Sequence, residues 1–123
     1  MAVWHVVLLK PRADLRAEQR RHFVDVFRRA VTSIPSVRGV RFGRRVKHGA
    51  GYERTAPDAG AFLAIIEFDS RAGLEAYLAH PAHAELGVAF GESLSAALVY
   101  DFEMLADNSE ELGAALAPLI EDP

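Results

Sequence analysis

Residues 74–86 read Leu-Glu-Ala-Tyr-Leu-Ala-His-Pro-Ala-His-Ala-Glu-Leu, and this stretch predicts a sharp corner between two helices. The ring of Pro81 crowds the preceding residue out of the α region, so the first helix is expected to end at His80. A second helix can begin with Pro81 in its first turn, where a missing N–H is tolerated. Tyr77 and His83 are therefore expected to flank a fixed corner.

A phenol and an imidazole held beside one turn can present a hydrogen-bond donor and a general base to the same small molecule. Tyr77 and His83 are thus a candidate proton-transfer pair. A structural interpretation competes with this one, because short motifs often occur by chance. In that interpretation Tyr77 is a core aromatic residue, and His80 and His83 cap or flank helix ends.

The segments on either side of the corner form a pattern of strands and helices. Apolar alternation predicts strands, and apolar spacing of three and four residues predicts helices. The expected strands are residues 2–10, 37–47, 61–69 and 97–105, and the expected helices are residues 14–33, 71–79 and 82–95. The order β, α, β, β, α, β with a split second helix predicts an α+β fold of the ferredoxin-like, split βαβ type. Such a fold has a four-stranded antiparallel sheet covered by helices on one side.

The first expected strand is apolar on both faces. One face carries His5, Val7 and Leu9, and the other carries Trp4, Val6 and Leu8. The helices can cover only one of these faces, and a second sheet is the natural cover for the other. The strand therefore predicts a homodimer that pairs through its sheet.

The helix expected over residues 14–33 has Asp14 at a position suited to capping its first turn. Its apolar stripe consists of Leu15, Phe23, Phe27, Ala30, Val31 and Ile34. The opposite face is rich in arginine. We interpret it as a solvated surface, because the net charge of the whole chain is −3.

The composition limits the possible classes of function. A chain of 123 residues fits one domain, and the absence of cysteine excludes disulfides and thiolate metal sites. The negative net charge argues against general nucleic-acid binding, although residues 38–47 form a short basic segment. No stretch approaches the roughly 18 apolar residues of a membrane span, and no leader pattern opens the chain. We expect a cytoplasmic protein that binds neither nucleic acid nor membrane.

The segment 48–60 is rich in glycine and polar residues and predicts a long loop between the second and third strands. Its length exceeds that of a tight hairpin, which is typical of a lid or of a disordered loop. A phosphate-binding glycine loop is disfavoured, because no Lys-Ser or Lys-Thr pair opens a helix after Gly49 and Gly51.

Three features within residues 1–105 resemble the stress-responsive dimeric α/β-barrel (Dabb) family. They are the opening strand Val3–Lys10 with its histidine, the strand that ends in Phe68-Asp69-Ser70, and the Tyr-x-x-His-Pro-x-His pattern of residues 77–83. The resemblance implies a ferredoxin-like monomer that pairs with a second copy to form a dimeric α/β barrel. It also implies a small apolar or polyketide-like ligand and no cofactor.

The corner together with His5 resembles the site of polyketide cyclases in this family. The implied catalytic residues are His83, which abstracts a proton between two carbonyls, Tyr77, which hydrogen-bonds the enolate oxygen, and His5, which supports or orients them. The expected substrate-binding residues are Val7, Leu9, Phe23, Val24, Phe27, Leu86 and Leu94. Two departures from this pattern stand out. Phe27 takes the place where a plant polyketide cyclase of the family has a phenol, and the loop 48–60 is an extra segment.

Other functions on the same fold remain open at this point. One is a non-catalytic, stress-responsive dimer that binds a small molecule, and another is a cofactor-free monooxygenase or a haem-degrading enzyme. A metal site at His80, His83 and Glu85 has suitable spacing, but a proline interrupts it and a further ligand is lacking. We therefore expect no metal.

The last residues, 106–123, extend beyond the part that resembles the family. Asp107–Glu111 can cap a short helix whose apolar side is Leu112, Ala115, Leu116, Leu119 and Ile120. We expect an appended helix or tail that follows a Dabb-like domain over residues 1–105. It either docks on a partner subunit, covers the site opening or has no role.

Overall fold

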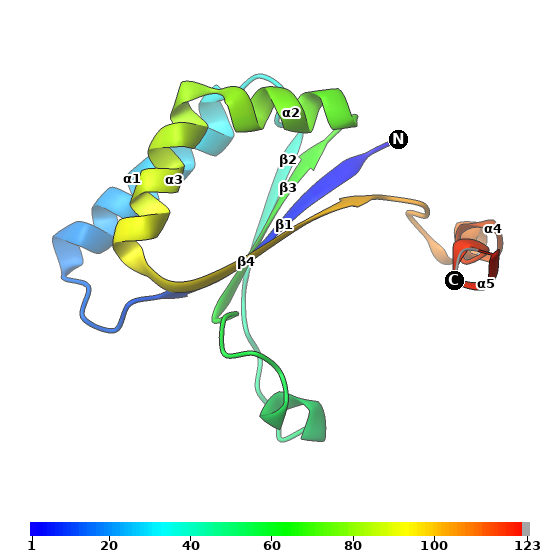
Figure 1. Cartoon of the computed structure of the whole chain (residues 1–123), viewed down its shortest axis with the longest axis horizontal. Helices are drawn as coiled ribbons and strands as arrows, with labels where there is room; N and C mark the ends of the chain where they lie inside the picture. Colours follow the sequence, from blue (N-terminus) through cyan, green and yellow to red (C-terminus); the bar gives the residue numbers. More distant parts are fainter. Residues whose placement is uncertain (122–123) are drawn as a thin grey trace.

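The protein folds into an antiparallel sheet with helices on one face, and the computed structural model describes residues 1–121 (Figure 1). The strands are β1 (Val3–Pro11), β2 (Gly39–Arg44), β3 (Phe62–Phe68) and β4 (Leu94–Glu103). The helices are α1 (Ala17–Ser33), η1 (Gly51–Arg54), α2 (Arg71–Ala79), α3 (Pro81–Ser93), η2 (Ser109–Glu111), α4 (Leu112–Ala115) and α5 (Pro118–Glu121). The sheet order is β2-β3-β1-β4, which confirms the predicted ferredoxin-like fold.

The pleat divides the sheet into a covered face and an open face. On β1 the residues His5, Val7 and Leu9 are buried, and α1, α2 and α3 lie over this face (Figure 1). Val26 and Ala30 bring α1 into the same core, which also includes Ile66 and Phe68 of β3. The open face carries Trp4, Val6, Leu8, Leu63, Ile65, Leu98, Tyr100 and Phe102. This face is mostly apolar, with the ion pair of Arg41 and Glu67 beside Trp4, and α1, α2 and α3 do not cover it.

The corner between α2 and α3 forms as predicted. Ser70 caps α2 by accepting a hydrogen bond from the amide of Gly73. His80 ends α2 with extended backbone and also caps α3, because its Nδ1 accepts from the amide of Ala82 at 3.0 Å. Pro81 occupies the first turn of α3, where proline is tolerated. The corner is therefore fixed by a cap and a proline together.

The start of α1 differs from the prediction. Arg16 is the N-cap residue, and its amide donates to the side chain of Gln19 at 2.8 Å. Asp14 does not cap the helix, because its carboxylate binds the guanidinium of Arg12 at 2.8 Å. A carboxylate binds a charged guanidinium two residues away more strongly than it binds a neutral backbone amide.

The bounds of three further elements also differ from the prediction. The strand expected over 37–47 is shorter, since β2 covers Gly39–Arg44 and Val46 lies outside it with 75% of its surface exposed. The helix expected over 82–95 ends at Ser93, and β4 follows at once from Leu94. Tertiary pairing decides this boundary, because Leu94, Ala96 and Ala97 pair with the end of β1.

The loop between β2 and β3 is closed by its own side chains. The carboxylate of Glu53 in η1 accepts hydrogen bonds from the amides of His48 and Gly49, both at 2.8 Å. These amides are therefore already satisfied, which removes the donors that a phosphate cradle needs. Figure 1 shows that this loop extends beyond the end of the sheet that lies away from α2.

The tail after β4 is a series of short helices, η2, α4 and α5, in place of the single helix that was predicted. Asn108 caps the first of them, and its side-chain oxygen accepts from the amides of Glu110 and Glu111. Residues 122 and 123, the end of the predicted tail, lie outside the described residues. Within residues 1–121, the helices are all too short or too polar to traverse a bilayer.

Candidate active site

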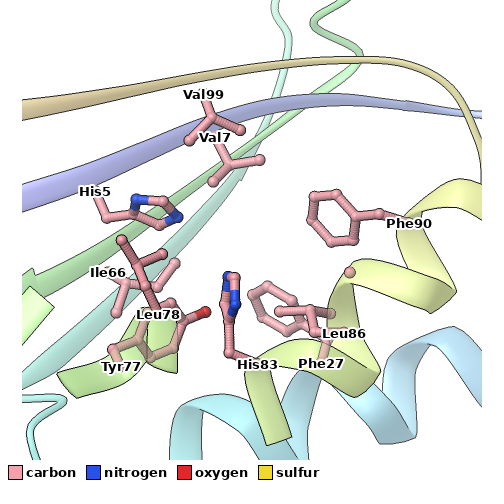
Figure 2. A pocket seen from close by; sticks show the side chains of 11 residues that line it. His5, Val7, Phe27, Ile66, Tyr77, Leu78, His83, Leu86, Phe90 and Val99 are labelled. Atoms are coloured by element: carbon pink, nitrogen blue, oxygen red, sulfur yellow. The ribbon is translucent and has the colours of Figure 1, made fainter. Parts of the chain in front are cut away.

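A pocket opens between the covered face of the sheet and the corner of α2 and α3. It has a volume of about 240 Å³. Figure 2 shows its side chains, which come from β1, β3 and β4 on one side and from α1, α2 and α3 on the other. The lining residues are His5, Val7, Phe27, Ile66, Tyr77, Leu78, His83, Leu86, Gly87, Phe90 and Val99. Almost all of them are apolar, so a few polar atoms determine the chemistry of the pocket.

Tyr77 supplies a phenol from the last turn of α2. Its side chain is almost fully buried, and its ring packs against Phe68 with a centroid distance of 5.2 Å. Burial raises the pKa of Tyr77 to about 12, so the phenol keeps its proton at neutral pH. In Figure 2 the hydroxyl points toward His83. Tyr77 is therefore a hydrogen-bond donor within an apolar environment.

His83 faces Tyr77 from the first turn of α3. The two ring centroids are 4.8 Å apart, and the rings meet edge to face. Burial lowers the pKa of His83 below its usual value, the nearby His5 lowers it further, and the backbone of Leu78 opposes the shift. A lowered pKa leaves the imidazole neutral at physiological pH. His83 is thus available to accept a proton.

His5 completes the polar group from β1. Its ring lies 5.7 Å from that of Tyr77, and its Nδ1 lies 2.5 Å from a carboxylate oxygen of Asp101. A carboxylate only accepts hydrogen bonds, so the Nδ1 of His5 carries the proton of this bond. In the neutral form of the ring, the other nitrogen, Nε2, carries a lone pair. Asp101 thus fixes the tautomer of His5.

Asp101 is a candidate site residue that was not predicted from the sequence. The β1–β4 register places it directly beside His5 on the covered face. The signal in the sequence is an acid within an otherwise apolar strand, but the partner of that strand follows only from the sheet order. The catalytic residues predicted from the sequence, His5, Tyr77 and His83, are brought together around one pocket.

The alternative metal site is not assembled. The Nδ1 of His80 is engaged as the cap of α3, and Glu85 forms an ion pair with Arg29 at 2.7 Å. Among residues 1–121, no three histidine, aspartate or glutamate side chains are grouped as metal ligands. The carboxylate of Glu85 instead joins α3 to α1.

The predicted substrate-binding residues separate into three groups. Val7, Phe27 and Leu86 line the pocket with the histidines. Leu9 is buried in the core and is not part of the pocket wall. Phe23, Val24 and Leu94 line a second apolar cavity of about 240 Å³, and Val24 has 49% of its surface exposed there. The other apolar residues of the pocket wall were not predicted from the sequence, and they are Ile66, Leu78, Gly87, Phe90 and Val99.

Aromatic pairs lie between the two cavities. Phe27 meets Phe42 edge to face at 6.0 Å, and Phe90 stacks with Phe23 at 5.6 Å. In each pair the first ring lines the pocket with the histidines and the second lines the other cavity. The two cavities are therefore neighbours that share an aromatic wall.

Comparison with known protein families identifies the fold family. The model of the stress responsive A/B barrel domain, Dabb, matches residues 3–104. The chain belongs to the Dabb family. This match covers all four strands, α1, α2 and α3, together with His5, Tyr77, His83 and Asp101. The tail lies outside it.

Relatives of this Dabb protein include one curated enzyme. Olivetolic acid cyclase from Cannabis sativa is 24% identical over 102 residues, which cover 83% of this chain and 96% of the cyclase. Two solved structures show the same fold. A hydroxynitrile lyase from Passiflora edulis has a TM-score of 0.70 at 14% identity, with 87% of this chain and 95% of that chain covered. A dimeric ferredoxin-like protein of unknown function from Thermobifida fusca has a TM-score of 0.65 at 19% identity, with 85% and 92% covered.

Proposed function

We propose that this Dabb protein is a cofactor-independent enzyme of the polyketide cyclase type. It enolises a linear β-polyketide, or a related β-dicarbonyl compound, and closes a ring by an intramolecular aldol reaction. The observation that carries the proposal is a neutral imidazole and a protonated phenol facing each other in an apolar pocket. The likeness to olivetolic acid cyclase over most of the chain supports the same class.

The first step is proton abstraction by His83. A carbon between two carbonyls is acidic enough for an imidazole to remove its proton, and the electrons of the C–H bond move onto a carbonyl oxygen to form an enolate. Tyr77 donates a hydrogen bond to that oxygen, which stabilises the developing negative charge within an apolar pocket. His5, held by Asp101, offers its Nε2 lone pair to a substrate hydroxyl or bound water.

The second step forms the ring. The enolate carbon attacks a distant ketone of the same chain, a C–C bond forms, and the ketone π electrons move onto its oxygen. The protonated His83 returns its proton to this oxygen, so no redox cofactor or metal is consumed. The apolar wall contributes by folding the substrate so that the reacting carbons are close. The ring of Phe27 lines the same pocket but has no hydroxyl group. The phenolic donor of the pocket is therefore Tyr77.

A product assay tests the proposal. Wild-type protein is incubated with a linear poly-β-keto thioester, and the products are separated by chromatography and identified by mass spectrometry. Spontaneous lactones form without protein, so the protein-free reaction is the control. We expect a new cyclic aldol product in the protein sample, with the mass of the substrate or of the substrate less one water. An unchanged product profile would overturn cyclisation of that substrate and would favour the non-catalytic, small-molecule-binding alternative or another reaction on the same barrel.

The pH profile of kcat/KM is expected to show a single acidic limb. His83 must be neutral to act as a base, and its lowered pKa keeps it neutral to a lower pH than a free histidine. The midpoint of the limb should therefore lie below about pH 6.5. Because the pKa of Tyr77 is about 12, ionisation of this phenol should not lower kcat/KM between pH 7 and about 10. A midpoint at or above pH 7 would contradict the role of His83.

Asp101 is expected to act as a positioning residue for His5. Asp101→Leu removes the acceptor of the Nδ1 proton and should lower kcat by roughly ten-fold, with little change in KM. Asp101→Asn keeps a neutral acceptor and should restore part of kcat. Glu103→Gln is the matched control, because Glu103 lies on the same strand outside the pocket. Equal losses in the leucine and asparagine variants would argue against a role through His5.

The protein is also proposed to be a homodimer that pairs through its open sheet face. Trp4, Val6 and Leu8 of β1 are half-buried in the monomer, and Tyr100 and Phe102 of β4 are more than half exposed. A patch of this kind normally marks an interaction site. Solved relatives with the same fold are dimeric, which supports a second copy as the partner.

A further inference from the structure

We infer that residues 105–121, which comprise Leu105 and the described part of the tail, form a second part of the homodimer interface and pack against the other copy of this chain. The inference rests on the homodimer proposed above but concerns residues beyond it. The family match ends at residue 104, and olivetolic acid cyclase is covered over 96% of its length by only 83% of this chain. The tail is therefore an addition to the part of the chain that these proteins share.

The path of the chain places the tail beside the open face. The amide of Met104 donates to the carbonyl of Ala2 at 2.8 Å, which ties the end of β4 to the start of β1. Figure 1 shows α4 and α5 beyond that end of β4, away from α1 and α3. Between the tail and the sheet lies a hollow of about 410 Å³ whose apolar walls come from both. The open face contributes Trp4, Val6 and Phe102, and the tail contributes Leu105, Leu112, Ala115 and Leu116.

The tail presents several exposed apolar side chains. Leu112 and Leu116, which face the hollow, are still 42% and 47% exposed. Leu119 and Ile120 of α5 are 80% and 85% exposed. Helices of three or four residues are marginal by themselves and require packing against another surface. Within residues 1–121 these leucine and isoleucine side chains stay exposed, so the tail has apolar surface available to a partner.

A second copy is the partner that fits this geometry. Two chains that pair face to face through a two-fold axis bring the open face of each against the other, and the tail lies at the edge of that face. Its apolar residues are continuous with Phe102 and Trp4, so both surfaces form one patch. Docking of the partner extends over the tail and buries Leu119 and Ile120.

The experiment compares dimer stability in the full chain. Leu119→Ser with Ile120→Ser removes the two most exposed apolar side chains of the tail, and Val88→Ser is the matched control. Val88 is 62% exposed but lies on α3, on the helical side of the sheet. Sedimentation equilibrium should show that the double variant raises the dimer Kd at least about ten-fold, because each substitution counts twice in a symmetric interface. The control should leave Kd unchanged.

A cross-linking measurement identifies what the tail contacts. The chain has no cysteine, so Ile120→Cys can be labelled at one position with a benzophenone maleimide. Irradiation should give a covalent dimer on a denaturing gel. Cross-links confined to one chain would overturn the inference. An unchanged dimer Kd in the double variant would also overturn it. Either result would leave the proposed homodimer intact. A wild-type protein that stays monomeric would overturn the homodimer and the tail interface together.

Discussion

Replacing His83 with alanine is expected to abolish nearly all cyclisation, with a fall in rate of about 10²–10⁴-fold. His83 lies in the pocket 4.8 Å from the ring of Tyr77, and burial keeps its imidazole neutral and able to accept a proton. Alanine removes the base without adding bulk. Product formation from the linear thioester, measured by chromatography and mass spectrometry, gives the rate for each protein.

His22→Ala provides the matched control for this substitution. His22 is an exposed histidine of α1 and lies outside the pocket, so its removal should leave the rate unchanged. Thermal unfolding of both variants separates a lost base from a lost fold. A His83→Ala protein that is folded and retains the wild-type rate would exclude His83 as the base.

Tyr77 is expected to affect activity and stability through different atoms. Tyr77→Phe removes only the hydroxyl that points toward His83, and it should lower kcat by roughly 10²-fold, as for the loss of one donor to a developing oxyanion. Its stability should remain close to wild type, because the ring still fills the core. Tyr77→Ala also removes that ring, which is 1% exposed, and should cost about 3–5 kcal/mol of unfolding free energy.

Denaturant titration and the product assay together measure these two effects. Tyr52→Phe is the control, because Tyr52 lies in η1 and is 66% exposed. It removes a hydroxyl far from the pocket and should change neither quantity. If Tyr77→Phe were as active as wild type, Tyr77 would be only a core aromatic residue with no part in the reaction.

The corner of α2 and α3 could be predicted from local sequence because local forces determine it. Pro81 excludes helical backbone at His80, and the side chain of His80 then caps the next helix. Both effects act within a few residues. The same holds for the order of strands and helices, which apolar periodicity indicates without knowledge of their partners.

The prediction that Asp14 caps α1 was wrong, and it shows a limit of prediction from residue type and position. Asp14 has the residue type and position of a helix cap, but Arg12 competes for its carboxylate and Arg16 takes the cap position. The cap of α3 succeeded because His80 has no competing partner among the described side-chain bonds. Which neighbouring group binds the carboxylate depends on the side-chain geometry, and the spacing of residues in the sequence does not give that geometry.

The sequence by itself determined the fold family, the corner and the apolar alternation of β1, since each depends on steric and solvation preferences of residues close in the chain. Tertiary structure alone decided that His5 is paired with Asp101, 96 positions away, because sheet register brings them together. It likewise assigned Phe23, Val24 and Leu94 to a second cavity. A cavity is the space that several packed elements leave between them, so its walls are set only when all of them are in place.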